Sequence, residues 1–319
     1  MSGMRVRVAG AGVVGLTSAL RLAEAGHQVE VIAAGLSEST TSSIAAALWY
    51  PYRAYPETAV TRWSAASFAA LRALSADPRS GVRLCPGREL FRRPAPDPWW
   101  RSAVPELGRV SADQLPEGYL DGYLLTVPVV DMALHLAWLV ARLRELGVGV
   151  EVQRLDDLDA AFTGVDVVVN CTGLGSRELA GDRTLSPVRG QVVVMEQFGL
   201  TEWLLDQSEP AELTYVVPRQ STVILGGTAE EGEADLEVRP AVTEAILARC
   251  RALVPEVAQA RVLDHRVGVR PARPAVRLET EVRARGPVVH CYGHGGAGVT
   301  LSYGCAEDVV EQVRQLGQG

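Results

Sequence analysis

The segment "RVRVAGAGVVGLTSALRLAEAGHQVEVIAA", residues 5–34, gives the strongest indication of the fold class. It begins with an apolar alternation typical of a buried strand, continues with apolar residues at helical spacing, and ends in a second apolar run. Between the first strand and the helix, Gly10, Gly12 and Gly15 form the pattern G-x-G-x-x-G. A glycine-rich turn in this strand–turn–helix context is typical of a dinucleotide-binding α/β fold.

Each glycine of the turn has an expected task in cofactor binding. Gly10 permits a tight turn, Gly12 lets a pyrophosphate approach the backbone, and Gly15 lets the helix pack closely on the strand. The helix N-terminus supplies N–H groups and a positive dipole end for the phosphates. We therefore expect the turn to contact the cofactor through Gly10, Ala11, Gly12, Val13, Val14 and Gly15.

The acidic residue that usually follows the second strand and binds the ribose is missing. Ala33, Ala34 and Gly35 stand there instead. Two alternatives remain for the ribose, namely the backbone or the Ser/Thr run at residues 39–43, whose hydroxyls could also meet the pyrophosphate. The glycine turn by itself leaves both NAD and FAD open as the cofactor.

Composition excludes several classes of protein. The chain has 319 residues, 47% of them hydrophobic and 22% charged, which suits a globular enzyme of about two domains. A formal net charge of −7 without a Lys/Arg block argues against a nucleic-acid partner. Five widely spaced cysteines without a C-x-x-C pair predict reduced thiols and no metal site. We recognise neither a secretory signal nor a membrane-spanning apolar run, so we expect a cytoplasmic enzyme without a membrane partner.

The pattern along the chain predicts two interleaved domains. The α/β texture of residues 1–50 returns at 131–185 and 262–319, and we assign these segments to a discontinuous nucleotide-binding domain. Residues 51–130 and 186–261 are richer in Pro, aromatic residues and strands, and we assign them to a substrate-binding domain. Helices are expected at about residues 59–74, 130–147, 240–254 and 303–316, and a β-hairpin at 214–227.

Three further stretches carry a family resemblance. They are "SIAAALWYPY" (43–52), "VGVRPARPAVRLE" (267–279) and "VVHCYGHGGAGVTLSYGCA" (288–306). Together with the glycine turn, they resemble the D-amino-acid oxidase family of FAD flavoproteins over nearly the whole chain. Two departures from the family pattern are Ala47, where glycine is usual, and Cys291. The resemblance implies an α/β fold with a Rossmann-like FAD-binding domain interleaved with a β-sheet-rich substrate-binding domain.

The resemblance also implies a non-covalently bound FAD that is held by segments beyond the turn. In the run "GHGGAGVT" (293–300), N–H groups at the start of the closing helix are expected to meet the electron-rich pyrimidine edge of the flavin. Ala297 is the one side chain that we expect this run to expose between Gly296 and Gly298. The implied FAD-binding residues beyond the turn are Thr40, Thr41, Ser42, Ala46, Ala47, Leu48, Trp49, Leu155, Thr172, Gly173, Arg270, Gly293, His294, Gly295, Gly296, Ala297, Gly298, Val299 and Thr300.

Arg270 stands at the end of an apolar strand, where an arginine fork can bind a carboxylate bidentately. Arg273 follows three positions later, so in extended structure the two side chains point to opposite faces and one can be structural. The resemblance selects Arg270 for the substrate carboxylate, Tyr215 as a second donor to it, and Gly296 as the carbonyl for the substrate amine. It places Tyr50 in the pocket wall, and these four residues are the predicted catalytic set.

The implied reaction is oxidative deamination of a D-amino acid by hydride transfer to the flavin. The products are a 2-oxo acid, ammonia and hydrogen peroxide, and dioxygen is the acceptor. The segment "AEEGEAD" (229–235) lacks the basic residue that relatives acting on D-aspartate carry there, so neutral, mainly apolar substrates are expected. The segment "SEPAEL" (208–213) lacks a second active-site tyrosine of better-known members, which predicts a shorter lid.

Several alternatives remain open. D-aspartate oxidation is one, since Arg53 or Arg219 could reach the pocket, and a glycine- or sarcosine-type amine oxidase is another. An NAD-dependent dehydrogenase is the alternative of a different class. The sequence also leaves open whether the chain forms a homo-oligomer.

Overall fold

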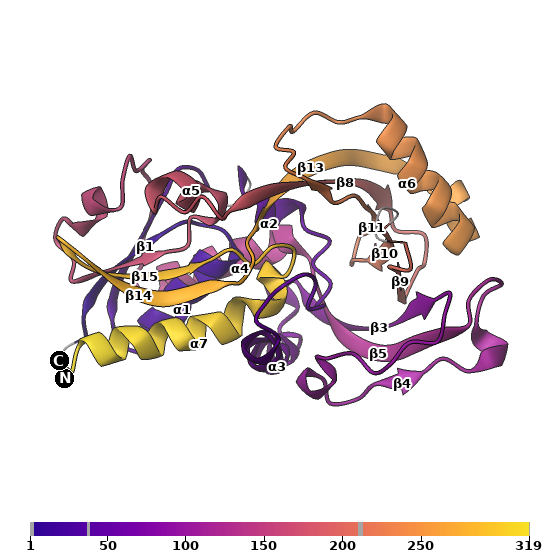
Figure 1. Ribbon diagram of the computed structural model, residues 1–319, viewed down its shortest axis with the longest axis horizontal. Helices are drawn as coiled ribbons and strands as arrows, with labels where there is room; N and C mark the ends of the chain where they lie inside the picture. Colours follow the sequence, from indigo (N-terminus) through magenta and orange to yellow (C-terminus); the bar gives the residue numbers. More distant parts are fainter. Residues whose placement is uncertain (1–2, 37–38, 210–212, 319) are drawn as a thin grey trace.

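The structure is a computed structural model that describes residues 3–36, 39–209 and 213–318, and within these residues two β-sheets form the framework (Figure 1). The first sheet has the strand order β14-β15-β7-β1-β2-β6. Its strands are β1 (Arg5–Ala9), β2 (Gln28–Ala33), β6 (Val150–Val152), β7 (Val167–Asn170), β14 (Arg277–Arg283) and β15 (Gly286–Tyr292). Neighbouring strands run parallel except β14 and β15, which are antiparallel.

Helices from distant parts of the chain pack together beside the first sheet. α1 (Val13–Glu24) follows β1 directly and packs against both α4 (Met132–Glu145) and α7 (Gly298–Leu316). Figure 1 shows α7 running along the sheet, and Gly317 after its end lies close to Met4 before β1, whose Sδ would be 3.1 Å from an added Cβ. The inward face of α1 is apolar and fully buried at Leu16 and Ala19, so burial against the sheet and its neighbours stabilises this helix.

The second sheet has the strand order β12-β8-β11-β10-β9-β3-β5-β4, and β13 pairs with β8. Its strands are β3 (Val82–Phe91), β4 (Gly108–Arg109), β5 (Asp121–Val130), β8 (Ser186–Glu196), β9 (Trp203–Asp206), β10 (Thr214–Pro218), β11 (Thr222–Gly226), β12 (Glu230–Glu231) and β13 (Val262–Ala272). The predicted hairpin at 214–227 is confirmed as β10 and β11.

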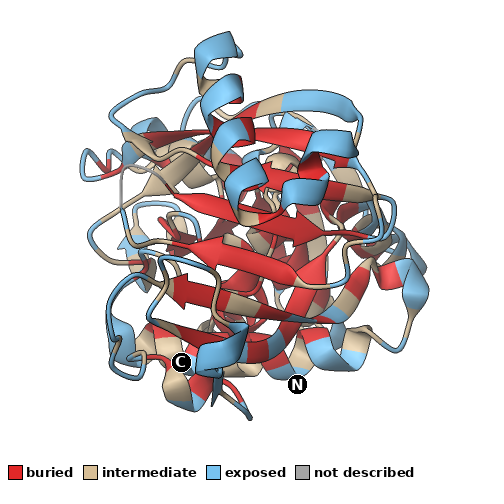
Figure 2. Cartoon of the chain, turned by 90° about the vertical axis from the view of Figure 1, so that its right-hand side faces the viewer, coloured by how far each residue is buried: buried red, intermediate tan, exposed pale blue. Residues whose placement is uncertain are grey.

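α6 (Pro240–Leu253) covers one face of the second sheet. Its inward residues Ile246, Leu247 and Cys250 are buried in an apolar cluster with Val193 and Val216 of the strands. Figure 2 shows the strands of this sheet largely buried and the helix above them exposed on its outer side. The sheet therefore has its own apolar core on that face, and its other face is free to line a cavity toward the first sheet.

A long pairing in the second sheet joins β8 to β13. It runs antiparallel from Val262 opposite Met195 to Ala272 opposite Ser186, after which the chain continues into β14 of the first sheet. β13 thus lies in the second sheet, although the segment 262–319 was assigned to the nucleotide-binding domain. The domain boundaries stay a prediction, and this strand belongs to the second sheet by its hydrogen bonds.

α3 (Glu57–Leu74) joins the segment after residue 51 to the helices of the first sheet. It packs on α7, where the backbone N–H of Gly304 donates to Ser67 Oγ at 2.9 Å. A Cβ at Gly304 would lie 2.3 Å from the carbonyl oxygen of Trp63. The helices approach this closely because Gly304 has no side chain. Two short helices, α2 (Thr41–Ile44) and α5 (Ser176–Leu179), flank the strands.

The expected α/β fold is confirmed, with two differences in its elements. α7 begins at Gly298 rather than near residue 303, because its first turns bury Val299 and Leu301 and so continue the helix into the glycine run. The strand β14 was not expected from the sequence, since its alternation is dominated by charged residues. Among the described residues, none of the helices combines the length and apolar character needed to cross a membrane.

We expect Gly304→Ala to lower the free energy of unfolding by about 1–3 kcal/mol, because the new methyl meets rigid backbone. Denaturant unfolding measures this difference. Gly149→Ala is the matched control, since a Cβ at Gly149 would have nothing within 4 Å. Equal losses for the two variants would contradict the tight α3–α7 contact.

Candidate functional site

A cavity of about 810 Å³ lies where the carboxyl ends of β1 and β2 face the second sheet. Its volume is in the usual range for cofactor sites, and the carboxyl ends of parallel strands are where α/β folds bind ligands. The predicted site residues in its wall are Gly10, Ala11, Gly12, Val13, Val14, Thr40, Thr41, Ser42, Ala46, Ala47, Leu48, Tyr50, Leu155, Thr172, Gly173, Tyr215, Arg270, His294, Gly295, Gly296, Gly298 and Val299. The structure thus brings together residues from seven separate parts of the sequence.

The predicted cofactor residues that lie outside this wall are Gly15, Trp49, Gly293, Ala297 and Thr300. Gly15 has the expected packing role, since a Cβ there would lie 2.0 Å from the carbonyl oxygen of Gly10. Ala297 is fully buried, so the expectation that it exposes its side chain is wrong. Gly293 faces Arg273, whose Cβ would lie 2.9 Å from an added Cβ.

Trp49 and Thr300 lie outside the cavity wall and fix the backbone next to Tyr50 and at Tyr50 itself. Trp49 is buried and donates its Nε1–H to the carbonyl of Ser64 at 3.1 Å. Thr300 Oγ1 accepts from the backbone N–H of Tyr50 and donates to its carbonyl, both at 3.0 Å. These contacts tie the start of α7 to the segment that follows α2, so both residues position the wall without being part of it.

The glycine turn adopts the geometry expected of it. Gly10 has a φ of 117°, and a Cβ there would lie 2.4 Å from the carbonyl oxygen of Cys171. The N-terminus of α1 faces the cavity through Gly12 and Val13. Ser42 Oγ accepts from the N–H of Val13 at 3.0 Å. The dipole end of a long helix and a side-chain-free backbone therefore meet at one end of the cavity, which suits a phosphate.

The end of β2 shows which carboxylates could replace the missing ribose ligand. The segment after β6 lies beside β2, because Gln153 donates its backbone N–H to the carbonyl of Ala33 at 2.8 Å. Asp156 in this segment and Glu178 of α5 both line the cavity. The sequence did not indicate either residue. The position of Asp156 depends on the pairing of β2 with β6, which no local pattern indicates.

Arg270 lies in the cavity wall with its charge uncompensated. Its Nη1–H donates to the carbonyl oxygen of Thr228 at 2.9 Å, and no ion pair joins it to a carboxylate among the described residues. A Cβ at Gly190 would lie 2.4 Å from Nη1 of Arg270, so the guanidinium rests on bare backbone of β8. An unpaired, half-buried cation of this kind favours binding of an anion.

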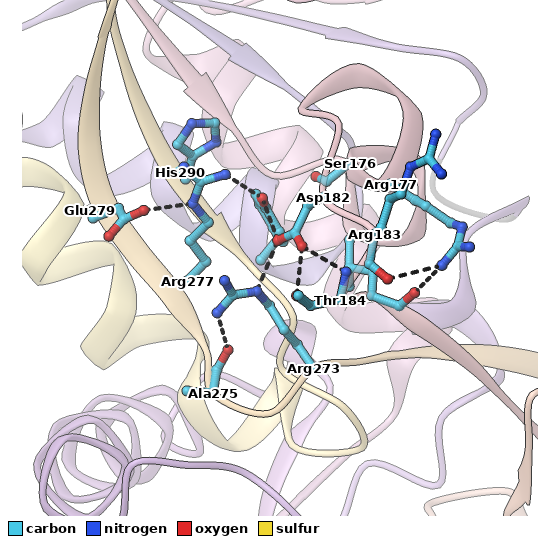
Figure 3. Close-up of polar contacts among 12 residues, drawn as sticks. Ser176, Arg177, Asp182, Arg183, Thr184, Arg273, Ala275, Arg277, Glu279 and His290 are labelled. Carbon is cyan, nitrogen blue, oxygen red and sulfur yellow. Dashed lines mark hydrogen bonds and ion pairs between the residues drawn. The ribbon is translucent and has the colours of Figure 1, made fainter.

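Arg273 has the structural role that the spacing allowed. Its Nε–H donates to Asp182 Oδ2 at 2.9 Å and its Nη1–H to the carbonyl of Ala275 at 2.8 Å (Figure 3). Thr184 also donates to the carboxylate. Burial opposes ionisation of Asp182, but the hydrogen bonds from Thr184 and Arg273 prevail and hold its pKa well below its usual range. Arg273 is therefore paired inside the fold, whereas Arg270 lines the cavity.

Tyr215 of β10 lies close to Arg270. Burial raises the pKa of its phenol, and the Arg270 charge opposes this rise without cancelling it, so the hydroxyl stays protonated at neutral pH and can donate. Its ring lies on Gly226 and Gly227, where an added Cβ at Gly226 would be 2.0 Å from Cζ. The sequence analysis did not single out Gly190, Gly226 or Gly227, whose signal was only the presence of glycine inside a strand or at its end.

The hydroxyl of Tyr50 contacts a buried carboxylate, Glu89, that the sequence did not indicate. This hydroxyl lies 2.8 and 3.0 Å from the two carboxylate oxygens of Glu89 on β3. Gln207 donates its Nε2–H to the same carboxylate at 2.9 Å. Burial raises the pKa of Glu89 to about 7, although the hydrogen bonds from Tyr50 and Gln207 favour its charged form. Nothing in the local pattern of β3 distinguishes Glu89 from a surface residue.

Neither arginine that would have favoured an acidic substrate lies in the wall of this cavity. Arg53 pairs with Glu231 at 2.8 Å and lines a separate cavity of about 260 Å³. Arg219 is buried and donates to the carbonyl of Ala45. Of the predicted lid at 208–213, Leu213 lines the cavity and residues 210–212 lie outside the described residues.

His294 and two cysteines form a compact buried group. The ligand atoms of Cys291, His294 and Cys305 lie within 4.8 Å of one another, an arrangement that the wide sequence spacing of the cysteines had not indicated. Burial lowers the pKa of His294 to about 4, so its ring is neutral where it lines the cavity. All five cysteines are buried free thiols, as the sequence predicted.

Comparison with known proteins gives a consistent family. A family model described as FAD dependent oxidoreductase matches residues 5–312. The D-amino-acid oxidase of Rubrobacter xylanophilus is 52% identical, covering 97% of each chain, and the D-aspartate oxidase of Homo sapiens is 34% identical, covering 99% of this chain and 96% of that one. The crystal structure of glycine oxidase from Geobacillus kaustophilus has a TM-score of 0.82 at 20% identity, covering 98% of this chain and 95% of that one, and so shares the fold.

Asp182→Asn should lower the free energy of unfolding at pH 7 by about 1–3 kcal/mol, because it removes a charged partner of Arg273. The folded-state pKa of Asp182 is depressed, so its contribution is present above the ordinary carboxyl pKa of about 4 and is lost as the pH falls below it. Unfolding measured at several pH values should show the difference shrinking below about pH 4. Exposed Asp113→Asn is the control, and a difference that stays constant down to about pH 3 would contradict the assignment.

Gly190→Ala should displace the guanidinium of Arg270 while leaving stability nearly unchanged, because the clashing atom is the end of a flexible side chain. We expect binding of a small carboxylate such as benzoate to the FAD-loaded protein to weaken at least about tenfold. Calorimetric titration measures this affinity. Gly108→Ala in the same sheet, where an added Cβ would be 3.5 Å from its nearest neighbour, serves as control. Unchanged affinity in the Gly190 variant would show that the anion binds elsewhere.

Proposed function

Because the chain belongs to the family of FAD dependent oxidoreductases that includes the D-amino-acid oxidases, we propose that it oxidatively deaminates neutral, mainly apolar D-amino acids. The products are a 2-oxo acid, ammonia and hydrogen peroxide. The observation that carries the proposal is the uncompensated Arg270 beside the protonated phenol of Tyr215, in the cavity that the glycine turn also lines.

The substrate carboxylate binds the guanidinium of Arg270, replacing part of the hydrogen bonding that Thr228 now receives. Tyr215 donates its hydroxyl to the same carboxylate, and the carbonyl of Gly296 accepts from the substrate amine. Tyr52 packs on Gly296, where an added Cβ would lie 2.7 Å from its ring, so a side chain at this position would crowd the site. These contacts fix the orientation of the Cα–H bond, which is the main task left to the protein.

The chain's own residues suit an FAD at the other end of the cavity. Bound FAD supplies the oxidising chemistry, by accepting hydride from the substrate and passing electrons to dioxygen. The turn from Gly10 to Val14 holds the pyrophosphate, and Asp156 or Glu178 accepts from the ribose hydroxyls. The run from His294 to Val299, at the N-terminus of α7, would hold the flavin. The neutral ring of His294 brings no charge to that contact.

The end of the cavity that would receive the substrate's side chain, called the side-chain end below, favours neutral substrates. Leu205, Leu213 and Val217 supply apolar wall, and Arg53 and Arg219 are engaged elsewhere. D-aspartate oxidation is the second candidate, supported by the identity with the human D-aspartate oxidase. It is less favoured because, among the described residues, the arginines of the cavity wall are Arg154 and Arg270. Arg270 is already assigned to the substrate carboxylate.

Dioxygen as the electron acceptor and a cytoplasmic location are parts of the same proposal, and they follow from the oxidase chemistry and from the sequence expectations. A homo-oligomer remains an alternative to a monomer, and size-exclusion chromatography with light scattering distinguishes the two states. The chemistry proposed for the cavity uses residues of one chain and does not depend on that result.

Peroxide release by the FAD-loaded protein tests the function across D- and L-amino acids. We expect turnover of D-alanine, D-valine and D-leucine, slower turnover of D-aspartate, glycine and sarcosine, and none of the L-enantiomers. Arg270→Ala should keep FAD bound and raise KM at least about 100-fold. Arg266→Ala, which removes an arginine of the same strand that pairs with Asp264, is the control that should retain activity. Preference for D-aspartate or for L-amino acids would overturn the proposal.

A further inference from the structure

Glu89 is a buried carboxylate without a cation. It is 2% exposed near the end of β3, and no Lys, Arg or His nitrogen forms an ion pair with it in the described part of the chain. Its partners are the hydroxyl of Tyr50 and the amide of Gln207. Burying a carboxylate without a cation is costly, and the proposed reaction needs no acid or base at this position. A different role at the cavity accounts for its place in the fold.

Tyr50 and Gln207 form a layer between Glu89 and the cavity. Both residues line the main cavity, whereas Glu89 lies outside its wall. Both also line the neighbouring cavity of about 260 Å³, so they stand where the two spaces adjoin. Strand pairing fixes this arrangement, since Glu89 is directly opposite Leu205 of β9, the strand that leads to Gln207. The carboxylate therefore acts on the cavity through one layer of side chains.

We propose that Glu89 determines substrate specificity, by making the side-chain end of the cavity electronegative through Tyr50 and Gln207 so that D-amino acids with anionic side chains are rejected. This inference rests on the proposed D-amino-acid oxidase function and names the residue that excludes acidic substrates. Glu89 is a positioning residue in this account, because it acts through its neighbours and does not touch the substrate.

The first contribution is the orientation of the Gln207 amide. An ionised carboxylate is only an acceptor, so it requires the NH₂ end of the amide, and Nε2 of Gln207 is indeed 2.9 Å from Oε1 of Glu89. The end that remains for the cavity wall is the carbonyl oxygen. A carbonyl oxygen accepts from neutral or cationic side chains and repels a carboxylate, so the wall discriminates by polarity.

The second contribution is charge. The titratable groups packed around Glu89 are Tyr50, Tyr123 on the paired strand β5, and Asp206 at the end of β9, and none of them carries positive charge. Burial raises the pKa of Glu89 to about 7, so its charged fraction grows as the pH rises through neutrality. Discrimination against an anionic side chain should therefore increase between about pH 6 and pH 8, and fall when Glu89 is protonated.

The test compares D-glutamine with D-glutamate, which have the same shape and differ in side-chain charge. With wild-type, FAD-loaded enzyme, the ratio of kcat/KM for D-glutamine over D-glutamate should rise several-fold from pH 6 to pH 8. In Glu89→Gln the ratio should fall at least about tenfold at pH 8, mainly through a lower KM for D-glutamate, and should no longer depend on pH. Glu196→Gln is the matched control, because Glu196 is a carboxylate of the same sheet that pairs with Arg261 and is not a partner of Glu89, Tyr50 or Gln207.

Each outcome bears on a different claim. A ratio that is the same in wild-type and Glu89→Gln enzyme, or that Glu196→Gln changes equally, would overturn the role of Glu89. Oxidation of D-alanine with a pH-independent wild-type ratio would do so as well, and this measurement needs no variant to fold. Failure of the wild-type enzyme to oxidise any D-amino acid would instead refute the proposed function, and the inference with it.

Discussion

The antiparallel pairing of β8 with β13 is the constraint on which the rest of the site depends. It sets Gly190 opposite Gly268, two residues before Arg270, and so brings the guanidinium onto bare backbone at the cavity. The same strand then leads into β14 of the first sheet. One pairing thus fixes both the position of Arg270 and the junction of the two sheets, and the cavity lies at that junction.

Arg270 and Arg273 differ in whether a carboxylate of the fold pairs with them, and this difference distinguishes the binding arginine from the structural one. Arg273 is matched by Asp182, so its charge is used inside the fold. Arg270 has only the carbonyl oxygen of Thr228 and a nearby phenol, so its charge remains for a ligand. Leaving such a cation unpaired costs stability, which the fold offsets through its large apolar cores. Glu89 is the opposite case, a buried anion without a cation, held behind the cavity wall.

The local sequence pattern was sufficient to predict the elements that depend on residues close together in the chain. The glycine turn and α1 followed from spacing, and the structure has them as expected. Burial of its first turns decided where α7 begins, and burial also removed Ala297 from the cavity wall. These results depend on tertiary packing, for which a run of glycines gives no signal.

Long-range strand pairing explains what the sequence could not indicate. Asp156 reaches the end of β2 because β6 pairs there. Glu89 reaches Gln207 because β3 pairs with β9, more than a hundred residues later in the chain. The family resemblance supplied the assignment of Tyr215 and Gly296, whose positions in the cavity no residue pattern predicted by itself.

The central claim is that Arg270 binds the carboxylate of the substrate. A crystal structure of the FAD-loaded protein with a bound 2-oxo acid, the proposed product, tests it most directly. The account predicts a carboxylate held by both terminal nitrogens of Arg270, with the hydroxyl of Tyr215 donating to it. A carboxylate bound away from Arg270, with the guanidinium still donating only to Thr228, would contradict the account.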